Sequence, residues 1–244
     1  MIPKIIHYCW FGRDRMPELA QKCIESWKRN LPDYELREWN EYTFDINSNS
    51  YAKEAYQSKK FAFVTDYVRL YVLYNVGGIY MDTDVEVVKN LDFFLDQPAF
   101  TGFEDEVRIP TGIMASEQYG EWAKWQLRYY QDRHFILSDT IDITTNVKII
   151  GNLMEKEGFI LKNSLQNFKD IITIYPKDYF CPKDYETGQI HLTSNTHCIH
   201  HFAGSWIPWY VKAESKFWKY CRMKDNHILD RIIRKLVKIK YKLS

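Results

Sequence analysis

Three acidic side chains, Asp82, Asp84 and Glu86, alternate with other residues at the end of the segment 77–86, Gly-Gly-Ile-Tyr-Met-Asp-Thr-Asp-Val-Glu. If a strand continues through them, they point to the same side of a sheet. Carboxylates crowded in this way repel each other unless a pKa rises or a cation is shared. Oxygen ligands without cysteine suit a hard ion such as Mg²⁺ or Mn²⁺ rather than zinc. The segment therefore predicts a divalent-metal site, and the alternative is an edge strand with a solvated acidic face.

The position of Asp82 and Asp84 favours the metal site. The pair follows the apolar residues 79–81, which read as a short strand that begins after Gly77 and Gly78. In open α/β sheets, ligands bind beyond the carboxyl ends of the strands. We therefore expect the acidic pair to lie at a ligand-binding edge of a sheet.

A second charged pair lies just upstream, in residues 61–76. These residues are apolar nearly all round, which predicts a buried helix. Asp66 and Arg69 are the exceptions, and their spacing of three puts them on one helix face. An ion pair facing a protein interior rarely recovers its desolvation cost. We interpret the pair as functional, and a structural ion pair is the alternative.

Histidine and tryptophan gather in residues 200–209, His-His-Phe-Ala-Gly-Ser-Trp-Ile-Pro-Trp. Imidazole ligates metals at neutral pH, and the glycine allows a tight turn beside the aromatic residues. This combination favours a second part of the metal site over an ordinary loop. A histidine buried in the core is the alternative.

The elements around these residues predict an α/β protein. Residues 5–11 form a short apolar run, residues 17–30 have helical spacing, and residues 34–39 alternate as a half-buried strand does. This β-α-β opening favours a parallel sheet. A further strand is expected at residues 98–103 and a helix at residues 121–133.

The composition excludes several classes of protein. With 244 residues, 45% of them hydrophobic, the chain can bury a sizeable core. A net charge of +1 gives no general attraction for nucleic acid, and no nucleic-acid-binding signature is present. The five cysteines are scattered and lack a C-x-x-C pair, as expected of reduced thiols. Without a secretory signal or a long apolar run, we expect a cytoplasmic protein with one catalytic domain over residues 1–224.

The last residues, 225–244, are helical in pattern and strongly basic. Apolar residues at helical spacing with flanking cations are typical of a helix that lies in a membrane interface. Basic residues near an anionic surface add to such binding. We expect peripheral binding to the inner face of the cell membrane, and docking of this helix on the catalytic domain is equally open.

Residues 63–74 and 77–85, FVTDYVRLYVLY and GGIYMDTDV, together resemble the signature of glycosyltransferase family 32, the DXD sugar transferases. Residues 2–12 also resemble the opening strand of that family, and the resemblance extends over roughly residues 1–210. The family includes bacterial capsular and surface-polysaccharide transferases and is similar to the catalytic domains of clostridial glucosylating toxins. The resemblance implies a GT-A type nucleotide-diphospho-sugar transferase fold, with a Rossmann-like mixed sheet flanked by helices.

The resemblance also implies roles for the acidic residues and their neighbours. Asp82 would contact the donor ribose or a metal-bound water, and Asp84 would bind the metal directly. Asp66 and Arg69 would face the donor sugar and diphosphate. Trp10 would stack on the nucleotide base, although a core tryptophan is the alternative.

The segment that begins at residue 200 resembles the closing segment of retaining GT-A enzymes. His201 fits the spacing His-x-x-Gly and would complete the metal shell with Asp82 and Asp84, with His200 as the alternative. Ser205 and Trp206 would contact the diphosphate. Further contacts to the acceptor or the sugar are expected in the segments that contain Thr111, Gly112, Thr145 and Asn146.

The sequence thus predicts a metal-dependent, retaining hexosyltransferase that uses Mn²⁺ or Mg²⁺ and a nucleotide sugar, expected to be UDP-linked. The expected acceptor is a glycan or a lipid-linked oligosaccharide, in the synthesis of a surface polysaccharide such as a capsule. The alternatives are a metal-dependent nucleotide-sugar hydrolase, a two-carboxylate glycosidase and a non-catalytic carbohydrate-binding protein. Clustering of the carboxylates within one short segment argues against a glycosidase, and a binding module leaves Asp66, Asp82 and Asp84 without a role.

Overall fold

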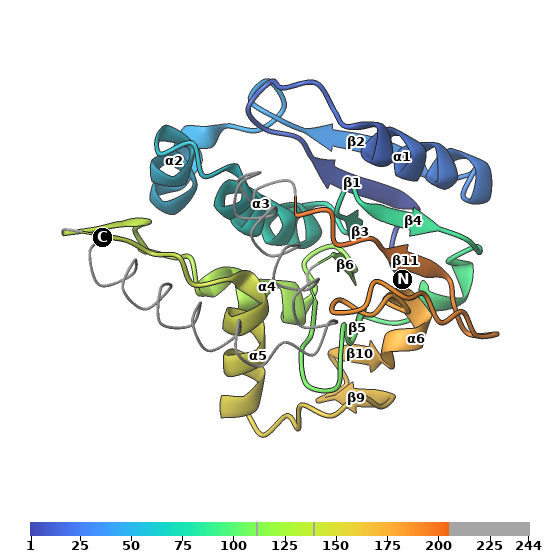
Figure 1. Cartoon of the computed structure of the whole chain (residues 1–244). Helices are drawn as coiled ribbons and strands as arrows, with labels where there is room; N and C mark the ends of the chain where they lie inside the picture. The colour runs from blue at the N-terminus through green and yellow to red at the C-terminus, as the bar shows by residue number, and fades with distance from the viewer. Residues whose placement is uncertain (111, 139, 205–244) are drawn as a thin grey trace, which may run out of the picture. The chain divides into compact units, whose positions relative to one another are not determined.

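A seven-stranded mixed sheet runs through the unit Met1–Ala203 (Figure 1). The structure is a computed structural model, and it describes residues 1–110, 112–138 and 140–204. Strands β1, β2 and β3 pair in parallel, as do β5 and β10, whereas β6 runs antiparallel to both of its neighbours. The strand order is β2 (Glu35–Trp39), β1 (Ile5–Cys9), β3 (Gly78–Met81), β6 (Ile113–Ser116), β5 (Ala99–Gly102), β10 (Ile172–Tyr175) and β9 (Gln166–Phe168).

The β-α-β opening expected from the sequence is confirmed. Strand β1, helix α1 (Glu18–Asn30) and strand β2 follow one another, and β1 and β2 pair in parallel. The short helices η1 (Ile46–Ser48) and α2 (Ser50–Gln57) lead into α3 (Phe61–Asn75), which runs directly into β3. The predicted buried helix is therefore the element that delivers the acidic segment.

Two hydrophobic cores cover the two faces of the sheet. Helices α2, α3, α4 (Glu121–Arg128) and α5 (Asn146–Lys156) contribute to the first core. Helix α1, the short α6 (Lys177–Phe180) and residues near η2 (Asp92–Phe94) contribute to the second. Strand β3 contributes to both cores because its side chains alternate between the two faces of the sheet. Tyr80 packs into the first core, and Ile79 and Met81 pack into the second. This alternation gives an α/β protein with helices on both sides of a mixed sheet, as predicted.

Two small antiparallel pairs lie outside the large sheet. Strand β4 (Val85–Val87) pairs with β11 (Cys198–His200). The other pair is a hairpin formed by β7 (Ile136–Leu137) and β8 (Thr140–Ile141). The β4–β11 pair matters for function because it joins the acidic segment to the histidine-containing segment.

Two details differ from the sequence expectation. The helix expected at residues 121–133 ends at Arg128, where Tyr129 N and Tyr130 N donate to carbonyls three residues back and close the helix with tighter turns. Helix α5 was not predicted. No helix in the described part of the chain is long and apolar enough to cross a bilayer. Ser205, Trp206, the proposed domain boundary at residue 224 and the basic segment 225–244 lie outside the described residues.

Candidate active site

The turn between α3 and β3 depends on Gly77 and Gly78. Their φ angles are +75° and +116°, a region that residues with side chains rarely adopt. A Cβ atom at Gly77 would lie 2.6 Å from Gln118 N, and one at Gly78 would lie 2.7 Å from Ile5 O. The glycines therefore let β3 begin immediately after the helix and against β1.

A buried histidine fixes the same turn. Trp39 Nε1 donates to His7 Nδ1 at 3.0 Å, so His7 Nε2 carries the proton and donates to Gly77 O at 2.8 Å. Burial lowers the pKa of His7 to about 4, although the bond to Gly77 opposes the change. His7 is thus a neutral side chain that joins β1, β2 and the glycine turn.

The acidic segment turns rather than continuing as a strand. Strand β3 ends at Met81, Asp82 N donates to Gly112 O at 2.8 Å, and Val85 N donates to Asp82 O at 3.0 Å. The expectation that all three carboxylates share one face is therefore wrong for Glu86. Its carboxylate lies 2.9 Å from His201 Nε2 instead.

The pairing of β4 with β11 brings His200 to the acidic pair. His200 lies opposite Val85 in the register, and its Nε2 atom is 3.3 Å from Asp84 Oδ1. Asp82, Asp84 and His200 each offer a ligand atom within 4.8 Å of the others. His201, the preferred candidate from the sequence, follows the last residue of β11, and its side chain faces Glu86 while that of His200 faces Asp84. We call Asp82, Asp84 and His200 the metal-site cluster.

Asp84 and His200 hold each other in charged forms. Burial alone would raise the pKa of Asp84, but His200 and the 2.6 Å bond from Ala203 N hold it below its ordinary value. Burial would likewise lower the pKa of His200, but the Asp84 carboxylate raises it well above the ordinary value. The Phe202 ring packs 4.3 Å from the imidazole, centroid to centroid. The pair is therefore preorganised, and a bound cation would take over the role of the imidazolium proton.

Gly112 allows this arrangement by its size. A Cβ atom at this position would lie 2.9 Å from His200 Nδ1 and Cε1. Gly112 was singled out as a contact to the acceptor or the sugar, and the structure gives it a packing role beside the histidine. Its neighbour Thr111 lies outside the described residues.

Arg69 joins the helical pair to the acidic segment. Its Nη2 atom lies 3.1 Å from Asp66 Oδ1 and 3.5 Å from Asp82 Oδ1, and its guanidinium carbon lies 4.7 Å from the centre of the Tyr80 ring. Tyr80 donates its hydroxyl to Asp82 Oδ1 at 2.6 Å. Asp66 and Arg69 are only 8% and 5% exposed. The predicted functional pair and the metal-site cluster are therefore one continuous site.

The carboxyl group of Asp66 is strongly affected by its surroundings. Burial raises its pKa to about 7, Arg69 opposes this rise, and the charge of Asp82 adds to it. Asn146, at the start of α5, lies near Asp66 and favours the charged form of its carboxyl group, although its buried Nδ2 atom has no hydrogen-bond partner among the described residues. Tyr130 donates to Asn146 Oδ1 at 3.5 Å. A group with such a pKa can accept or donate a hydrogen bond near neutral pH.

Sequence reasoning missed Tyr80 and Tyr130. Tyr80 lies two residues before Asp82 and therefore on the same side of β3, which is a signal that could have found it. Tyr130 is connected to Asp66 through Asn146, which approaches Asp66 only by tertiary packing. No local sequence pattern therefore marks Tyr130 as a site residue. The indole of Trp10 donates to Asp14 O at 2.7 Å and is partly exposed, so stacking on a base stays a prediction. Ser205 and Trp206 are not among the described residues.

Comparison with known families identifies the class of protein. Residues 17–101 match the family described as "Glycosyltransferase sugar-binding region containing DXD motif", and this range includes Asp66, Arg69, Asp82 and Asp84. The resemblance to the DXD sugar transferases of glycosyltransferase family 32 is thus confirmed over these residues. Glycosyltransferase is the class that this region and the site define.

Among its relatives, the chain is 24% identical to inositol phosphoceramide mannosyltransferase 2 of Schizosaccharomyces pombe, over 96% of the chain and 72% of that protein. It is 33% identical to inositol phosphoceramide mannosyltransferase 3 of the same yeast, over 46% of the chain and 33% of that protein. Among solved structures, the PaToxG glycosyltransferase is similar, with 19% identity, a TM-score of 0.47, and coverage of 64% of this chain and 69% of that chain.

Proposed function

We propose that this protein is a metal-dependent, retaining hexosyltransferase that uses a nucleotide sugar, with the site described above as its donor site. The observation that carries the proposal is the convergence of Asp82, Asp84 and His200, with Arg69 linking Asp82 to Asp66. The match to a DXD sugar-binding region supports the same assignment.

The residues of the metal-site cluster fit Mn²⁺ or Mg²⁺. Two carboxylates and one imidazole supply the oxygen and nitrogen ligands that such ions accept, and no cysteine is within the cluster. When bound, the ion would neutralise the charge that develops on the departing nucleoside diphosphate. Asp82 keeps its orientation through Tyr80, and Asp84 through Ala203 N.

Arg69 and Asp66 would position the donor. The guanidinium is held between two carboxylates, so its direction is fixed before a ligand arrives. Asp66 would bind a sugar hydroxyl, since a carboxyl group with a pKa of about 7 can serve as either partner of a hydrogen bond. The acceptor hydroxyl would lose its proton to the leaving phosphate oxygen on the same face of the sugar. That course requires no further base and keeps the anomeric configuration.

The acceptor in this proposal is a glycan or a lipid-linked glycan. The names of the yeast relatives, inositol phosphoceramide mannosyltransferases, support a phosphate-containing lipid as one acceptor class and mannose as one donor sugar. A UDP-linked hexose and a role in surface polysaccharide synthesis stay part of the proposal. So do a cytoplasmic location and the attachment of residues 225–244 to an anionic membrane.

A donor and acceptor screen tests the proposal. The purified protein is incubated with UDP- and GDP-linked hexoses, with and without Mn²⁺, and with glycan and glycolipid acceptors. Manganese-dependent transfer with retained configuration, lost in Asp84→Ala, is expected. Release of free sugar at the same rate with and without acceptor would instead identify a hydrolase, and an inverted product would contradict retention.

A further inference from the structure

Four side chains from three segments of the chain form a connected surface next to His200. They are Glu104, Arg108, Tyr185 and Phe202, and we call them the flanking surface. The donor pair joins the metal-site cluster at another point, because Arg69 contacts Asp82. The proposed donor site therefore leaves the flanking surface without a role.

Phe202 links the metal-site cluster to Tyr185. Its ring centroid lies 4.3 Å from that of His200 and 5.4 Å from that of Tyr185, whose ring meets it edge to face. The φ angle of Phe202 is +55°, in a region that residues with side chains rarely adopt. Strained backbone of this kind is typical of functional sites. Tyr185 is 55% exposed, so an aromatic surface leads from the metal-site cluster to solvent.

The turn that carries Tyr185 is held against the end of β11. Lys183 donates from Nζ to His201 O at 2.8 Å. Asp184 N donates to Gln189 O at 2.8 Å and closes the turn itself. The backbone at Tyr185 is therefore in place before a ligand binds, which lowers the entropic cost of binding.

Glu104 reaches the same place from the large sheet. Strands β3 and β5 both run antiparallel to β6, so their carboxyl ends lie at the same edge, where Glu104 follows β5 and Asp82 follows β3. The side chain of Glu104 is 12% exposed, and its Oε1 atom lies 3.4 Å from Arg108 Nε. Burial raises the pKa of Glu104, whereas the charges of Arg108 and His200 oppose the rise. A largely buried carboxylate thus lies beside the metal-site cluster.

Arg108 completes the flanking surface and leaves it with an excess of negative charge. Its Nε atom pairs with both Glu104 and Asp105, so two carboxylates share one guanidinium. Burial lowers the pKa of Arg108, but Asp105, Glu104 and Tyr185 together raise it above its ordinary value, which places Tyr185 near the guanidinium. A phosphate group would meet repulsion here, whereas an uncharged ligand would not.

We propose that the flanking surface binds an uncharged sugar ring of the acceptor, the ring whose hydroxyl group receives the transferred sugar. Aromatic side chains pack against the C–H groups of a sugar ring, and a carboxylate accepts hydrogen bonds from its hydroxyl groups. Tyr185 and Phe202 supply the first kind of contact, and Glu104 supplies the second. The inference rests on the proposed function and names the class of its acceptor, the sugar end of a soluble glycan or of a glycolipid.

Sugar binding is measured without turnover on the full-length protein, by saturation-transfer difference NMR with Mg²⁺ and UDP present. The probes are methyl α-D-mannopyranoside, methyl β-D-glucopyranoside, methyl β-D-galactopyranoside and mannose 6-phosphate. At least one methyl glycoside should bind, and more tightly than mannose 6-phosphate. Tighter binding of its n-octyl glycoside would identify a glycolipid and equal binding a soluble glycan, and both results support the proposal. No binding of any methyl glycoside, or binding of the phosphate as tight as theirs, would overturn it.

Two variants and one matched control locate the bound sugar. Tyr185→Ala removes the exposed ring, and Glu104→Gln removes a charge while keeping the size of the side chain. Each should weaken binding of the methyl glycoside about tenfold, since hydrogen bonds to charged groups and aromatic contacts are each of that strength. Phe93→Ala removes another exposed aromatic ring and should bind as the unchanged protein does. Unchanged binding in both variants, or an equal loss in the control, contradicts the proposal.

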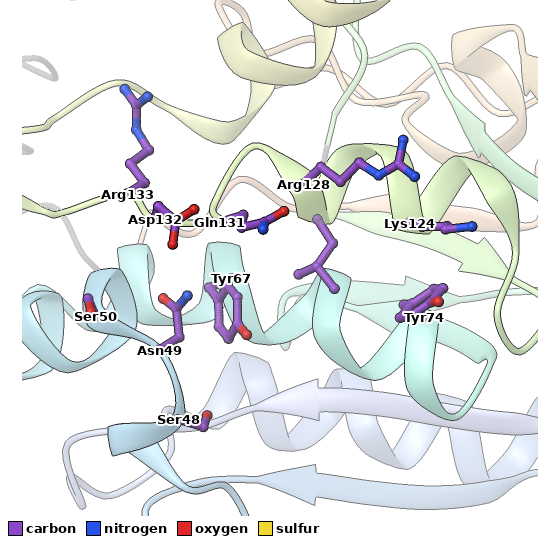
Figure 2. Close-up of a pocket in the computed structure, with 11 residues that line it drawn as sticks. Ser48, Asn49, Ser50, Tyr67, Tyr74, Lys124, Arg128, Gln131, Asp132 and Arg133 are labelled. Carbon is purple, nitrogen blue, oxygen red and sulfur yellow. The ribbon is translucent and has the colours of Figure 1, made fainter.

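Two other places are tested as alternative sites for the sugar. One is a pocket of about 450 Å³ between η1, α2, α3 and α4, which is lined by Arg128 and shares no lining residue with the flanking surface (Figure 2). The other is the donor pair. Arg128→Ala and Asp66→Asn report on these places, and both should keep the affinity for the methyl glycoside. Loss of binding in either of them, with binding retained in Tyr185→Ala, would move the sugar away from the flanking surface and overturn the proposal.

Calorimetric titration with UDP and GDP in the presence of Mn²⁺ tests the proposed function separately. Absence of nucleotide binding in the unchanged protein would contradict the donor site, whatever the sugar does. Normal nucleotide binding in Tyr185→Ala and Glu104→Gln, together with unchanged sugar binding, would overturn the flanking surface alone. Normal nucleotide binding with weakened sugar binding is the expected result.

Discussion

His200 Nε2 lies 3.3 Å from Asp84 Oδ1, and the adjacent His201 turns away to Glu86. Two neighbouring histidines thus have different partners, and only one of them can complete a site with the acidic pair. The distinction gives a direct test of the metal-site cluster.

His200→Ala should weaken Mn²⁺ binding and lower transfer by about 100-fold or more, because a metal ligand supplies several kcal/mol of transition-state stabilisation. His201→Ala is the matched control and should retain most of the Mn²⁺ binding and most of the transfer activity. Calorimetric titration with Mn²⁺ and a nucleoside diphosphate measures the first quantity. The opposite ranking of the two variants would assign the ligand to His201.

Arg69→Ala should destabilise the fold by about 3–5 kcal/mol, because it leaves two carboxylates facing each other without their buried cation. Asp66→Asn should change the melting temperature little near pH 7, since Asp66 is already about half protonated there. Both variants should lose activity. Urea unfolding of the two variants measures the difference in their stability. Equal stability would show that Arg69 does not hold the carboxylates of Asp66 and Asp82 together.

Gly112→Ala should lower Mn²⁺ affinity by about tenfold, or about 1.4 kcal/mol, because the new methyl group pushes the His200 imidazole out of place. Gly151→Ala in α5 is the control, since its Cβ atom would meet only Leu161 Cδ1 at 3.6 Å. That change should leave metal binding unaltered and stabilise the helix by up to about 1 kcal/mol. Unchanged affinity in Gly112→Ala would mean that the histidine moves freely.

Acid should destabilise the protein through His7. Its pKa is lowered from 6.5 to about 4 in the folded state, so between these values the unfolded chain binds a proton that the folded protein does not. Stability is therefore complete above pH 6.5 and falls as pH drops towards 4, by about 3 kcal/mol in total. Urea unfolding at pH 7.5 and 5 should show a smaller loss in His7→Gln than in the unchanged protein. The exposed His191→Gln serves as the control, and an equal pH dependence in all three proteins would remove His7 as the cause.

Sequence reasoning reached the buried helix and the acidic segment because both are local patterns. Helix α3 was expected at residues 61–76 and spans Phe61–Asn75, and Asp66 and Arg69 lie on one face of it as the spacing requires. The place of Asp82 at the end of a strand was equally clear.

Sequence reasoning failed where long-range pairing decides the outcome. His200 and His201 are equivalent in a local pattern, and only the register of β11 against β4 separates them. The turn at Asp82 depends on a hydrogen bond to Gly112, which immediately precedes β6, the neighbour of β3 in the sheet. The approach of Asn146 to Asp66 likewise depends on how α5 packs, and α5 itself was not expected.

The pairing of β4 with β11 also determines when the site can form as the chain is synthesised. Every strand of the seven-stranded sheet precedes Cys198, whereas His200 belongs to the last strand of the described chain. A nascent chain that ends before Cys198 can therefore contain the whole sheet and both acidic residues, and still lack the imidazole and the strand that pairs with β4. The cluster is completed last, so a chain terminated before Cys198 lacks an intact metal site.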